Sequence, residues 1–132
     1  MTDTIENTDT SDVVAEVKVW LKDPGVIRHR GKLEAMISNA RSYLRLEDFS
    51  GFLWSVVDGA PRLNRWRCLR DVPSDSAESR ELARMLKSAG FRFVGPTTCY
   101  AFMQSAGLVN DHLVSCPAHR RCADAWTAHC SG

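Results

Sequence analysis

Four side chains near the carboxyl end have the types that bind metal ions: His112, Cys116, His119 and Cys122. Imidazole and thiolate groups suit tetrahedral zinc, and the i, i+4 spacing places His112 and Cys116 on one face if this turn is helical. These two residues alone leave a structural zinc site half complete. One hypothesis is therefore that all four side chains form the site. The alternative is a loosely ordered basic tail that contains these residues incidentally.

A turn between two predicted helices has the chemistry to bind phosphate. Residues 91–95 would join the helices into a helix-hairpin-helix, whose second helix begins with free backbone N–H groups and the positive end of its dipole. Gly95 has no side chain, so a phosphate could approach the backbone closely. An ordinary antiparallel helix pair, in which glycine and proline only shape the turn, is the alternative. The predicted DNA contacts of the hairpin are Arg92, Phe93, Val94, Gly95, Thr97 and Thr98.

Basic side chains outside the hairpin are further candidates for phosphate contacts. Arg28 and Arg30 precede a helix start, where the dipole disfavours cations, so a role other than helix stabilisation is favoured. A solvated turn is the alternative for these two residues. Trp66 lies between Arg65 and Arg67 and is a candidate for stacking on a base.

The composition is that of one globular domain with an uneven distribution of charge. The chain has 132 residues, 44% of them apolar and 25% charged. Residues 1–16 carry five acidic side chains and no Lys or Arg, whereas the other 116 residues carry all 17 basic and 11 acidic ones, a net charge of +6. Such a body is compatible with a polyanionic partner, although a normally solvated surface gives the same balance.

The cysteines and the first residues bear on where the protein acts. Five cysteines are an odd number, and the amino-terminal residues lack the basic and apolar regions of a secretion signal, so a disulfide framework is not expected. The sequence has no run of 18 apolar residues, which predicts no membrane span and no membrane partner. We therefore expect a cytoplasmic protein.

Apolar residues recur at spacings of three and four, which predicts an all-α fold. We expect a disordered acidic leader at residues 1–11, a helical domain at 12–116 with the hairpin at 76–107, and a poorly ordered tail at 117–132. Residues 61–74 are predicted to form a loop rich in arginine, and no strand is expected. The clearest apolar stripe consists of Leu33, Met36, Ile37, Ala40, Tyr43 and Leu44.

Local signals predict where the two hairpin helices begin and end. Asp75 and Glu78 have the spacing of a capping box for the first helix, and Gly90 is placed to end it in a left-handed conformation. Pro96 suits the first position of the second helix, which Gly107 ends. The inward stripe of this second helix is predicted to be Cys99, Phe102, Met103 and Ala106.

Six stretches, taken in order, resemble one known family. Together they resemble the constitutive, type I DNA-3-methyladenine glycosylases over about residues 17–116. The resemblance implies a helix-hairpin-helix glycosylase fold that acts on double-stranded alkylated DNA. It also implies hydrolysis of the N-glycosidic bond of 3-methyladenine in base excision repair, with the damaged nucleotide flipped into a pocket. The stretches are residues 25–32 (GVIRHRGK), 39–44 (NARSYL), 52–56 (FLWSV), 90–95 (GFRFVG), 99–104 (CYAFMQ) and 107–112 (GLVNDH).

The resemblance also implies which parts these residues do not supply. In the family, the two halves of the chain each supply two ligands to a structural zinc, and His112 and Cys116 match the second pair. The first half also supplies the Glu that recognises the base and the aromatic residues that stack on it. Residues 1–16 contain no Cys, His or aromatic side chain. No catalytic residue is therefore carried over, and the side chains predicted to be solvated helix charges are Glu34, Glu47, Glu78 and Glu81.

The fold is accordingly predicted to be truncated at the amino-terminal side, and activity of this chain alone is not expected. The chain can be interpreted as a glycosylase, as a non-catalytic helix-hairpin-helix module that binds DNA, or as half of a split enzyme that needs an amino-terminal partner. In the last case, helices built to pack on the missing half would leave apolar faces in water.

Overall fold

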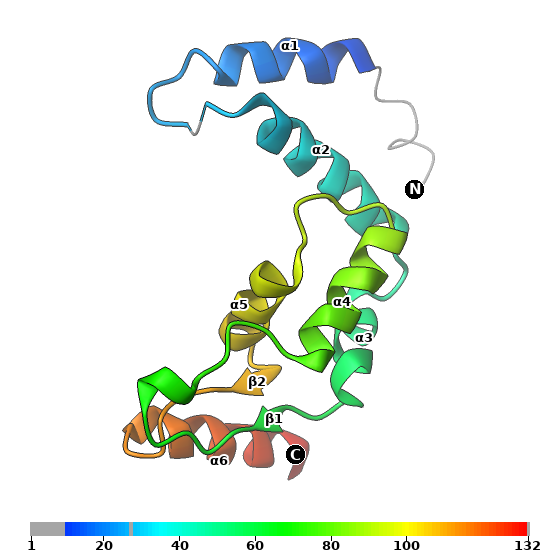
Figure 1. Ribbon diagram of the computed structural model, residues 1–132. Helices are drawn as coiled ribbons and strands as arrows, with labels where there is room; N and C mark the ends of the chain where they lie inside the picture. The colour runs from blue at the N-terminus through cyan, green and yellow to red at the C-terminus, as the bar shows by residue number, and fades with distance from the viewer. Residues whose placement is uncertain (1–9, 27, 132) are drawn as a thin grey trace. The chain divides into compact units, whose positions relative to one another are not determined.

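The computed structural model describes residues 10–26 and 28–131, and these residues are mostly helical (Figure 1). The all-α prediction is therefore confirmed. The chain divides into two compact units: unit 1 comprises Met1–Glu47 with Leu86–Phe93, and unit 2 comprises Asp48–Met85 with Val94–Gly132. No helix among the described residues is long and apolar enough to cross a membrane. Most of the predicted leader lies outside these residues.

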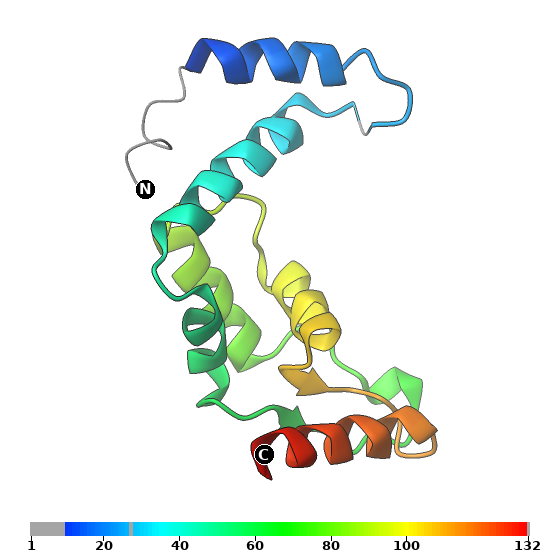
Figure 2. The same ribbon diagram turned by 180° about the vertical axis from the view of Figure 1, so that it is seen from behind.

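Unit 1 is built on a pair of helices, α1 (Thr10–Trp20) and α2 (Arg30–Arg45), which pack against each other (Figures 1 and 2). Val17 of α1 and Leu33 of α2 are buried in this unit. Helix α1 begins at Thr10, so the last two residues of the predicted leader are helical rather than disordered.

The predicted inward stripe of α2 is only partly confirmed. Leu33 is buried, but Met36, Tyr43 and Leu44 remain 62%, 49% and 50% exposed. Periodicity identifies an apolar stripe, but whether other residues cover it depends on tertiary packing, which periodicity does not report.

Unit 2 has a core of Leu53, Val57, Leu82, Met103 and Leu108, all of them buried. It includes most of helix α4 (Ala77–Ser88), whose last residues belong to unit 1. The other helices are α3 (Phe49–Trp54), η1 (Ser55–Val57), η2 (Leu69–Asp71), α5 (Pro96–Ala106) and α6 (Pro117–Ser131), and the strands are β1 (Arg62–Leu63) and β2 (Val109–Asn110).

The prediction that residues 61–74 form a loop without any strand is wrong for Arg62–Leu63. Strand β1 pairs in parallel with β2, with Arg62 opposite Val109 and Leu63 opposite Asn110. Strands of two residues are too short to show an alternating pattern, and their pairing depends on a partner far away in the sequence. The pairing anchors the first residues of an arginine-rich stretch, residues 62–70, which we call the arginine segment.

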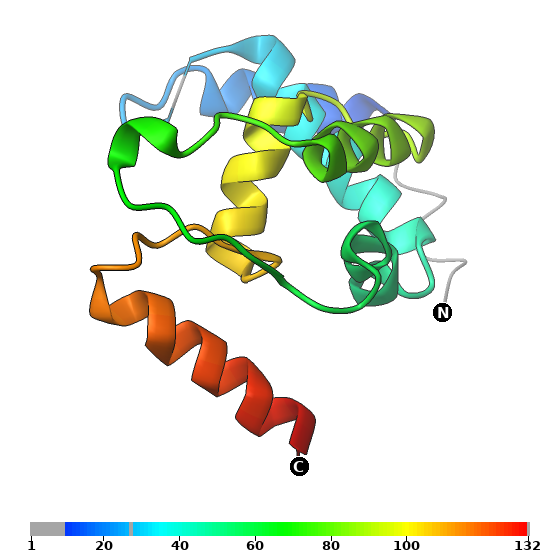
Figure 3. The ribbon, with the colours of Figure 1, turned by 60° about the horizontal axis from the view of Figure 1, so that its bottom comes forward.

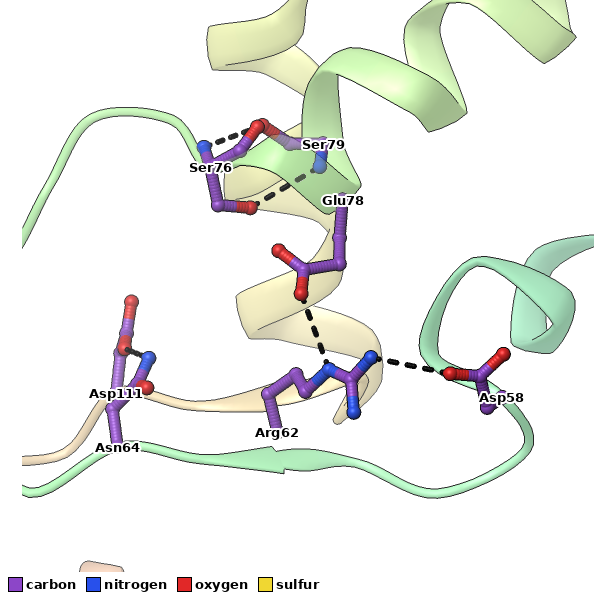
Figure 4. A network of polar contacts seen from close by, with 7 residues as sticks. All are labelled: Asp58, Arg62, Asn64, Ser76, Glu78, Ser79 and Asp111. Atoms are coloured by element: carbon purple, nitrogen blue, oxygen red, sulfur yellow. Dashed lines mark hydrogen bonds and ion pairs between the residues drawn. The ribbon is translucent and has the colours of Figure 1, made fainter.

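Helix α4 is capped one residue later than predicted. The backbone N–H of Ser79 donates to the hydroxyl of Ser76 at 3.1 Å, and the N–H of Ser76 donates to the hydroxyl of Ser79 at 2.8 Å. This reciprocal pair replaces the predicted pair of Asp75 and Glu78. Glu78 instead accepts a hydrogen bond from Nε of Arg62 at 3.2 Å (Figure 4).

The glycine and proline signals that mark the end of α4 and both ends of α5 are confirmed. Gly90 has a φ of 97°, and the N–H of Phe91 donates to the carbonyl of Leu86 at 3.0 Å, as in a helix end with a left-handed residue. Pro96 occupies the first turn of α5, and Gly107, with a φ of 85°, ends it.

The inward stripe of α5 differs from the prediction at two positions. Cys99, Tyr100 and Met103 are buried, whereas Phe102 is 42% exposed and Ala106 is exposed. Tyr100 is buried because its hydroxyl has a partner, Asp111, inside unit 2. Because the Tyr100 hydroxyl has this partner, Tyr100 is buried and the more apolar Phe102 is exposed, the opposite of what apolarity alone predicts.

The prediction of a poorly ordered tail at 117–132 is wrong for residues 117–131, which form helix α6. Pro117 occupies the first helical position, where its missing N–H has no consequence. Trp126 stacks on Trp54 with ring centroids 5.1 Å apart, and His119 is buried. Helix α6 is drawn in orange and red in Figure 3. Composition alone did not reveal it, because these contacts are with residues far away in the sequence.

Candidate nucleic-acid interface

The turn after α4 is fixed to helix α2 within unit 1. The side chain of Asn39 donates from Nδ2 to the carbonyl of Arg92 at 2.9 Å and accepts from the N–H of Arg92 at 2.8 Å. These two bonds satisfy both polar backbone groups of Arg92 and leave its side chain exposed. Asn39 lies in a stretch that resembles the family, but its role as a clamp was not predicted, because the two residues are 53 positions apart.

Phe93 has an unusual backbone and an exposed ring. Its φ is 58°, a left-handed conformation that is rare for a residue with a bulky side chain, and its exposed fraction is 54%. The ring meets His29 edge to face, with centroids 6.2 Å apart. His29 itself caps α2, because its Nδ1 accepts from the N–H of Lys32 at 3.1 Å.

These contacts bring two predicted DNA-binding stretches together in unit 1. Residues 28–32 lie beside the turn that carries Arg92 and Phe93, and Arg28 and Arg30 are exposed. Arg30 is 3.7 Å from the carboxylate of Glu34 in a largely solvated ion pair. An open groove of about 490 Å³ separates the stretches, and it is lined by Gly25, Val26, Lys32, Leu33, Ala35, Met36, Asn39, Arg92 and Phe93.

The other predicted hairpin contacts lie at the start of α5 in unit 2. Thr97 and Thr98 are exposed, and their N–H groups belong to the first turn of the helix. Gly95 precedes the helix with φ −69° and ψ 167°, a conformation open to any residue, and no side chain caps the helix there. A Cβ at Gly95 would meet nothing within 4 Å. The backbone at Val94 accepts a weak bond from the thiol of Cys99 at 3.5 Å.

A half-buried carboxylate, that of Asp111, was not recognised from sequence and organises unit 2. Oδ1 of Asp111 accepts from Nδ2 of Asn64 at 2.7 Å and from Nε1 of Trp66 at 2.8 Å. Oδ2 accepts from the hydroxyl of Tyr100 and from Nε2 of Gln104. Asn64 and Trp66 are too far from Asp111 in sequence for any spacing rule to pair them, although residues 107–112 resemble the family.

The electrostatics show that Asp111 is an anchor. Burial by itself raises the pKa of this carboxyl, but the hydrogen bonds from Asn64, Tyr100, Gln104 and Trp66 outweigh it and bring the pKa below the usual value. For Tyr100, burial and the neighbouring carboxylate both raise the pKa of the hydroxyl. The carboxylate is therefore ionised and has donors on both oxygens, which is the state of a structural hub.

The predicted zinc ligands do not come together as a complete site. Residues 112–116 form turns instead of a helix, so the condition for placing His112 and Cys116 on one helix face is not met. Nε2 of His119 lies 2.7 Å from the carbonyl of Asn64. No group of three or more metal-binding side chains occurs among residues 10–26 and 28–131, so the hypothesis of a site formed by all four residues is wrong. His112 and Cys116 would provide half a site at most.

Three of the four glutamates predicted to be solvated charges pair with arginines. Glu34 pairs with Arg30, and Glu81 with Arg84, whose hydrogen bond lowers the pKa of the Glu81 carboxyl. The side chain of Glu78 is only 30% exposed, because it bonds Arg62. Glu47 is exposed.

Comparison with known proteins identifies the family. A model of the methyladenine glycosylase family matches residues 4–120. DNA-3-methyladenine glycosylase 1 of Escherichia coli strain K12 is 46% identical over 105 residues, which are 76% of this chain and 56% of that protein. DNA-3-methyladenine glycosylase of Haemophilus influenzae is 48% identical over 106 residues, which are 77% of this chain and 57% of that protein.

A solved structure agrees with the sequence comparison. The crystal structure of a 3-methyladenine DNA glycosylase I superposes with a TM-score of 0.75 and 43% identity, over 89% of this chain and 65% of that one. The chain thus spans somewhat more than half the length of the curated relatives that it matches. On the match to residues 4–120 and these similarities, the chain belongs to the methyladenine glycosylase family.

Proposed function

We propose that this chain takes part in removing 3-methyladenine from alkylated double-stranded DNA, the first step of base excision repair. The observation that carries the proposal is the match of residues 4–120 to the family model, because the relatives it is similar to are DNA-3-methyladenine glycosylases. We also propose that the protein acts in the cytoplasm.

Within this function, the chain holds the DNA backbone. In unit 1, Lys32 and Arg92 line the groove, and Phe93 exposes an aromatic ring there. Arg28 and Arg30 are exposed just before Lys32 in the chain and add positive charge. Such contacts position a protein on the duplex without reading its sequence.

The start of α5 in unit 2 supports the same role. Neither backbone strain nor a neighbouring atom requires glycine at position 95. The alternative in which this glycine only shapes the turn is therefore weakened, and close approach of a phosphate remains a physical reason for it. Thr97 and Thr98 add hydroxyl groups beside the unbonded N–H groups.

The group that promotes base departure comes, in this proposal, from outside the described residues. Asp111 is surrounded by donors, and the carboxylates of Glu34, Glu78 and Glu81 are paired with arginines. The resemblance assigns base recognition to an amino-terminal part of the family that has no counterpart in residues 1–16. The described residues would thus act together with that amino-terminal part.

The test is the release of free 3-methyladenine from alkylated duplex DNA. We expect the folded chain alone to release base at the spontaneous rate, and a mixture with the amino-terminal half of the Escherichia coli relative to release it faster. That half alone is the control. Release by this chain alone would refute the assignment of catalysis to the family's amino-terminal part. DNA binding without release in either arrangement would instead support the non-catalytic module.

We propose that His112 and Cys116 are half of a structural zinc site that the family's amino-terminal part completes. Both side chains are of types that zinc prefers, and they flank the turn before α6. Metal analysis after dialysis should find less than about a tenth of an equivalent of zinc on the chain alone. It should find close to one equivalent in the mixed sample. A full equivalent on the chain alone, or none in a mixture that is active, would contradict the proposal.

A further inference from the structure

We propose that the arginine segment, residues 62–70 of unit 2, is a second DNA-contact surface, in which Arg65, Arg67 and Arg70 contact the phosphate backbone of the duplex. The choice of DNA as the partner rests on the proposed function. The surface itself is inferred from the charge, exposure and anchoring of this segment, and it is separate from the hairpin and the groove of unit 1.

The segment has an unusual concentration of unpaired positive charge. Its nine residues, RLNRWRCLR, include four arginines and no acidic residue. Arg62 is neutralised by Glu78 and Asp58, at 3.2 and 3.4 Å (Figure 4). The other three, Arg65, Arg67 and Arg70, are exposed, and no carboxylate among the described residues pairs with them.

Helix α4, also in unit 2, shows the contrasting arrangement. Arg80 pairs with Asp75 at 3.2 Å, and Arg84 pairs with Glu81. Charges that are already paired attract a polyanion less than unpaired ones, because the neighbouring carboxylate cancels much of their field. The arginine segment thus differs from α4, whose arginines Arg80 and Arg84 are paired with carboxylates.

The inner face of the segment is anchored, which directs its arginines outward. The side chains of Asn64 and Trp66 both donate to the same oxygen of Asp111, so both point to the interior of unit 2. Arg65 and Arg67 alternate along the chain with these two inward side chains. Arg65 and Arg67 therefore point away from Asp111, in agreement with their exposure.

Backbone hydrogen bonds hold the segment from two directions. On the side of β2, the N–H of Arg62 donates to Leu108 at 2.9 Å and the N–H of Asn64 donates to Asn110 at 3.2 Å. The N–H of Val114 donates to the carbonyl of Trp66 at 2.9 Å. Nε2 of His119, on α6, lies 2.7 Å from the carbonyl of Asn64. A segment ordered in advance loses little entropy when it binds a ligand.

The three exposed guanidinium groups of the arginine segment are suited to bind phosphate. Each guanidinium can donate two parallel hydrogen bonds to the oxygens of one phosphate. Arg121, on the first turns of α6, is also exposed, and it follows the residue that contacts Asn64 by two positions. Contacts of this kind do not read base sequence, so the surface should bind all duplexes alike.

The experiment compares two double variants of the full chain with equal loss of charge: Arg65→Ala with Arg67→Ala, and Arg80→Ala with Arg84→Ala. Fluorescence anisotropy of a labelled duplex, titrated at several salt concentrations, gives the slope of log Kobs against log salt. Each lost phosphate contact flattens this slope by about 0.9. We expect the first variant to flatten it by about 1.8 and the second to leave it nearly unchanged.

A second pair of measurements separates contact from folding. Arg65→Lys with Arg67→Lys should restore most of the slope, because lysine also neutralises phosphate. The thermal midpoints of all variants should equal that of the parent chain, since the changed side chains are exposed. Equal slopes for the two alanine variants, or no loss in the first, would overturn the inference.

The same titration distinguishes this inference from the proposed function. Suppose that the chain binds duplex DNA and that the salt slope flattens with Arg28→Ala and Arg30→Ala but not with Arg65→Ala and Arg67→Ala. Only the second surface is then refuted. If the parent chain does not bind duplex DNA at low salt, both the second surface and the DNA-holding role are refuted. Binding of polyglutamate with equal affinity and equal sensitivity to these variants would also overturn the choice of DNA as the partner.

Discussion

In unit 1, the turn that carries Arg92 and Phe93 is held to α2 through the side chain of Asn39, with two hydrogen bonds. In unit 2, the segment that carries Arg65 and Arg67 is held by the carboxylate of Asp111 and by backbone bonds to β2 and to residue 114. The first arrangement leaves apolar side chains of α2 exposed, whereas the second surrounds a half-buried carboxylate with hydrogen-bond donors.

The difference indicates where each region is vulnerable. A turn clamped at one point can lose its orientation while the rest of the unit stays folded. A segment tied to a central carboxylate shares that carboxylate with α5, so the anchor cannot be removed without loosening the unit. Loss of the Asn39 clamp in unit 1 should therefore affect binding more than stability, and substitution of the Asp111 hub in unit 2 should do the reverse.

The largest effect is expected for Asp111→Ala. The substitution leaves the donors of Asn64, Trp66 and Tyr100 without their acceptor, and we expect the free energy of unfolding to fall by about 3 kcal/mol. Urea denaturation followed by circular dichroism measures it. Asp124→Ala removes a carboxylate in an exposed pair 3.7 Å from Arg120, and it should change stability by less than about 0.5 kcal/mol. A similar small change for Asp111→Ala would show that the hub does not hold unit 2.

The two glycines that flank the turn sharpen the comparison. Gly90→Ala places a Cβ 3.0 Å from the hydroxyl of Ser42 at a φ of 97°, and it should destabilise the chain by about 1 to 2 kcal/mol. Gly95→Ala meets nothing within 4 Å and should leave stability within about 0.5 kcal/mol of the parent. If a phosphate approaches Gly95, this second variant should still weaken DNA binding. If Gly95→Ala leaves the affinity for DNA unchanged, Gly95 only shapes the turn.

Asn39→Ala tests the clamp of unit 1 directly. It leaves the N–H and the carbonyl of Arg92 without partners in an exposed turn, so we expect about 1 kcal/mol of lost stability and a larger proportional loss of DNA affinity. Asn39→Asp keeps the acceptor for the N–H of Arg92 but not the donor, and it should give intermediate values. Full affinity with Asn39→Ala would mean that the orientation of Arg92 and Phe93 does not matter for binding.

The smallest effect is expected for Arg28→Ala with Arg30→Ala. Both side chains are exposed, so stability should be unchanged, while the salt slope of DNA binding should flatten by about 1 to 2. The loss of affinity should be the same for duplexes of different sequence. A slope equal to that of the parent chain would indicate that these residues form a solvated turn.

Local signals predicted much of the helical architecture. Gly90, Pro96 and Gly107 mark helix ends through their own backbone preferences, and the structure places all three as expected. The capping box at α4 was recognised but placed one residue too early, since Ser76 and Ser79 also have the spacing that a cap requires. Arg92, Phe93, Arg28 and Arg30 were identified separately, and only the fold shows that their stretches are neighbours.

What the sequence by itself determined is therefore the class of fold, the helix ends marked by Gly90, Pro96 and Gly107, and the family resemblance. These depend on residues close together in the chain or on motifs in order. The tertiary structure alone decided which polar groups meet. Asp111 and Trp66 are 45 positions apart, and His119 and Asn64 are 55 apart. The contact with Asn64 removed His119 from the predicted metal site. The hydrogen bond to Asp111 accounts for the burial of Tyr100 in place of Phe102. The pairings also gave the arginine segment its inner and outer faces, because a buried polar group must find a partner wherever the fold supplies one.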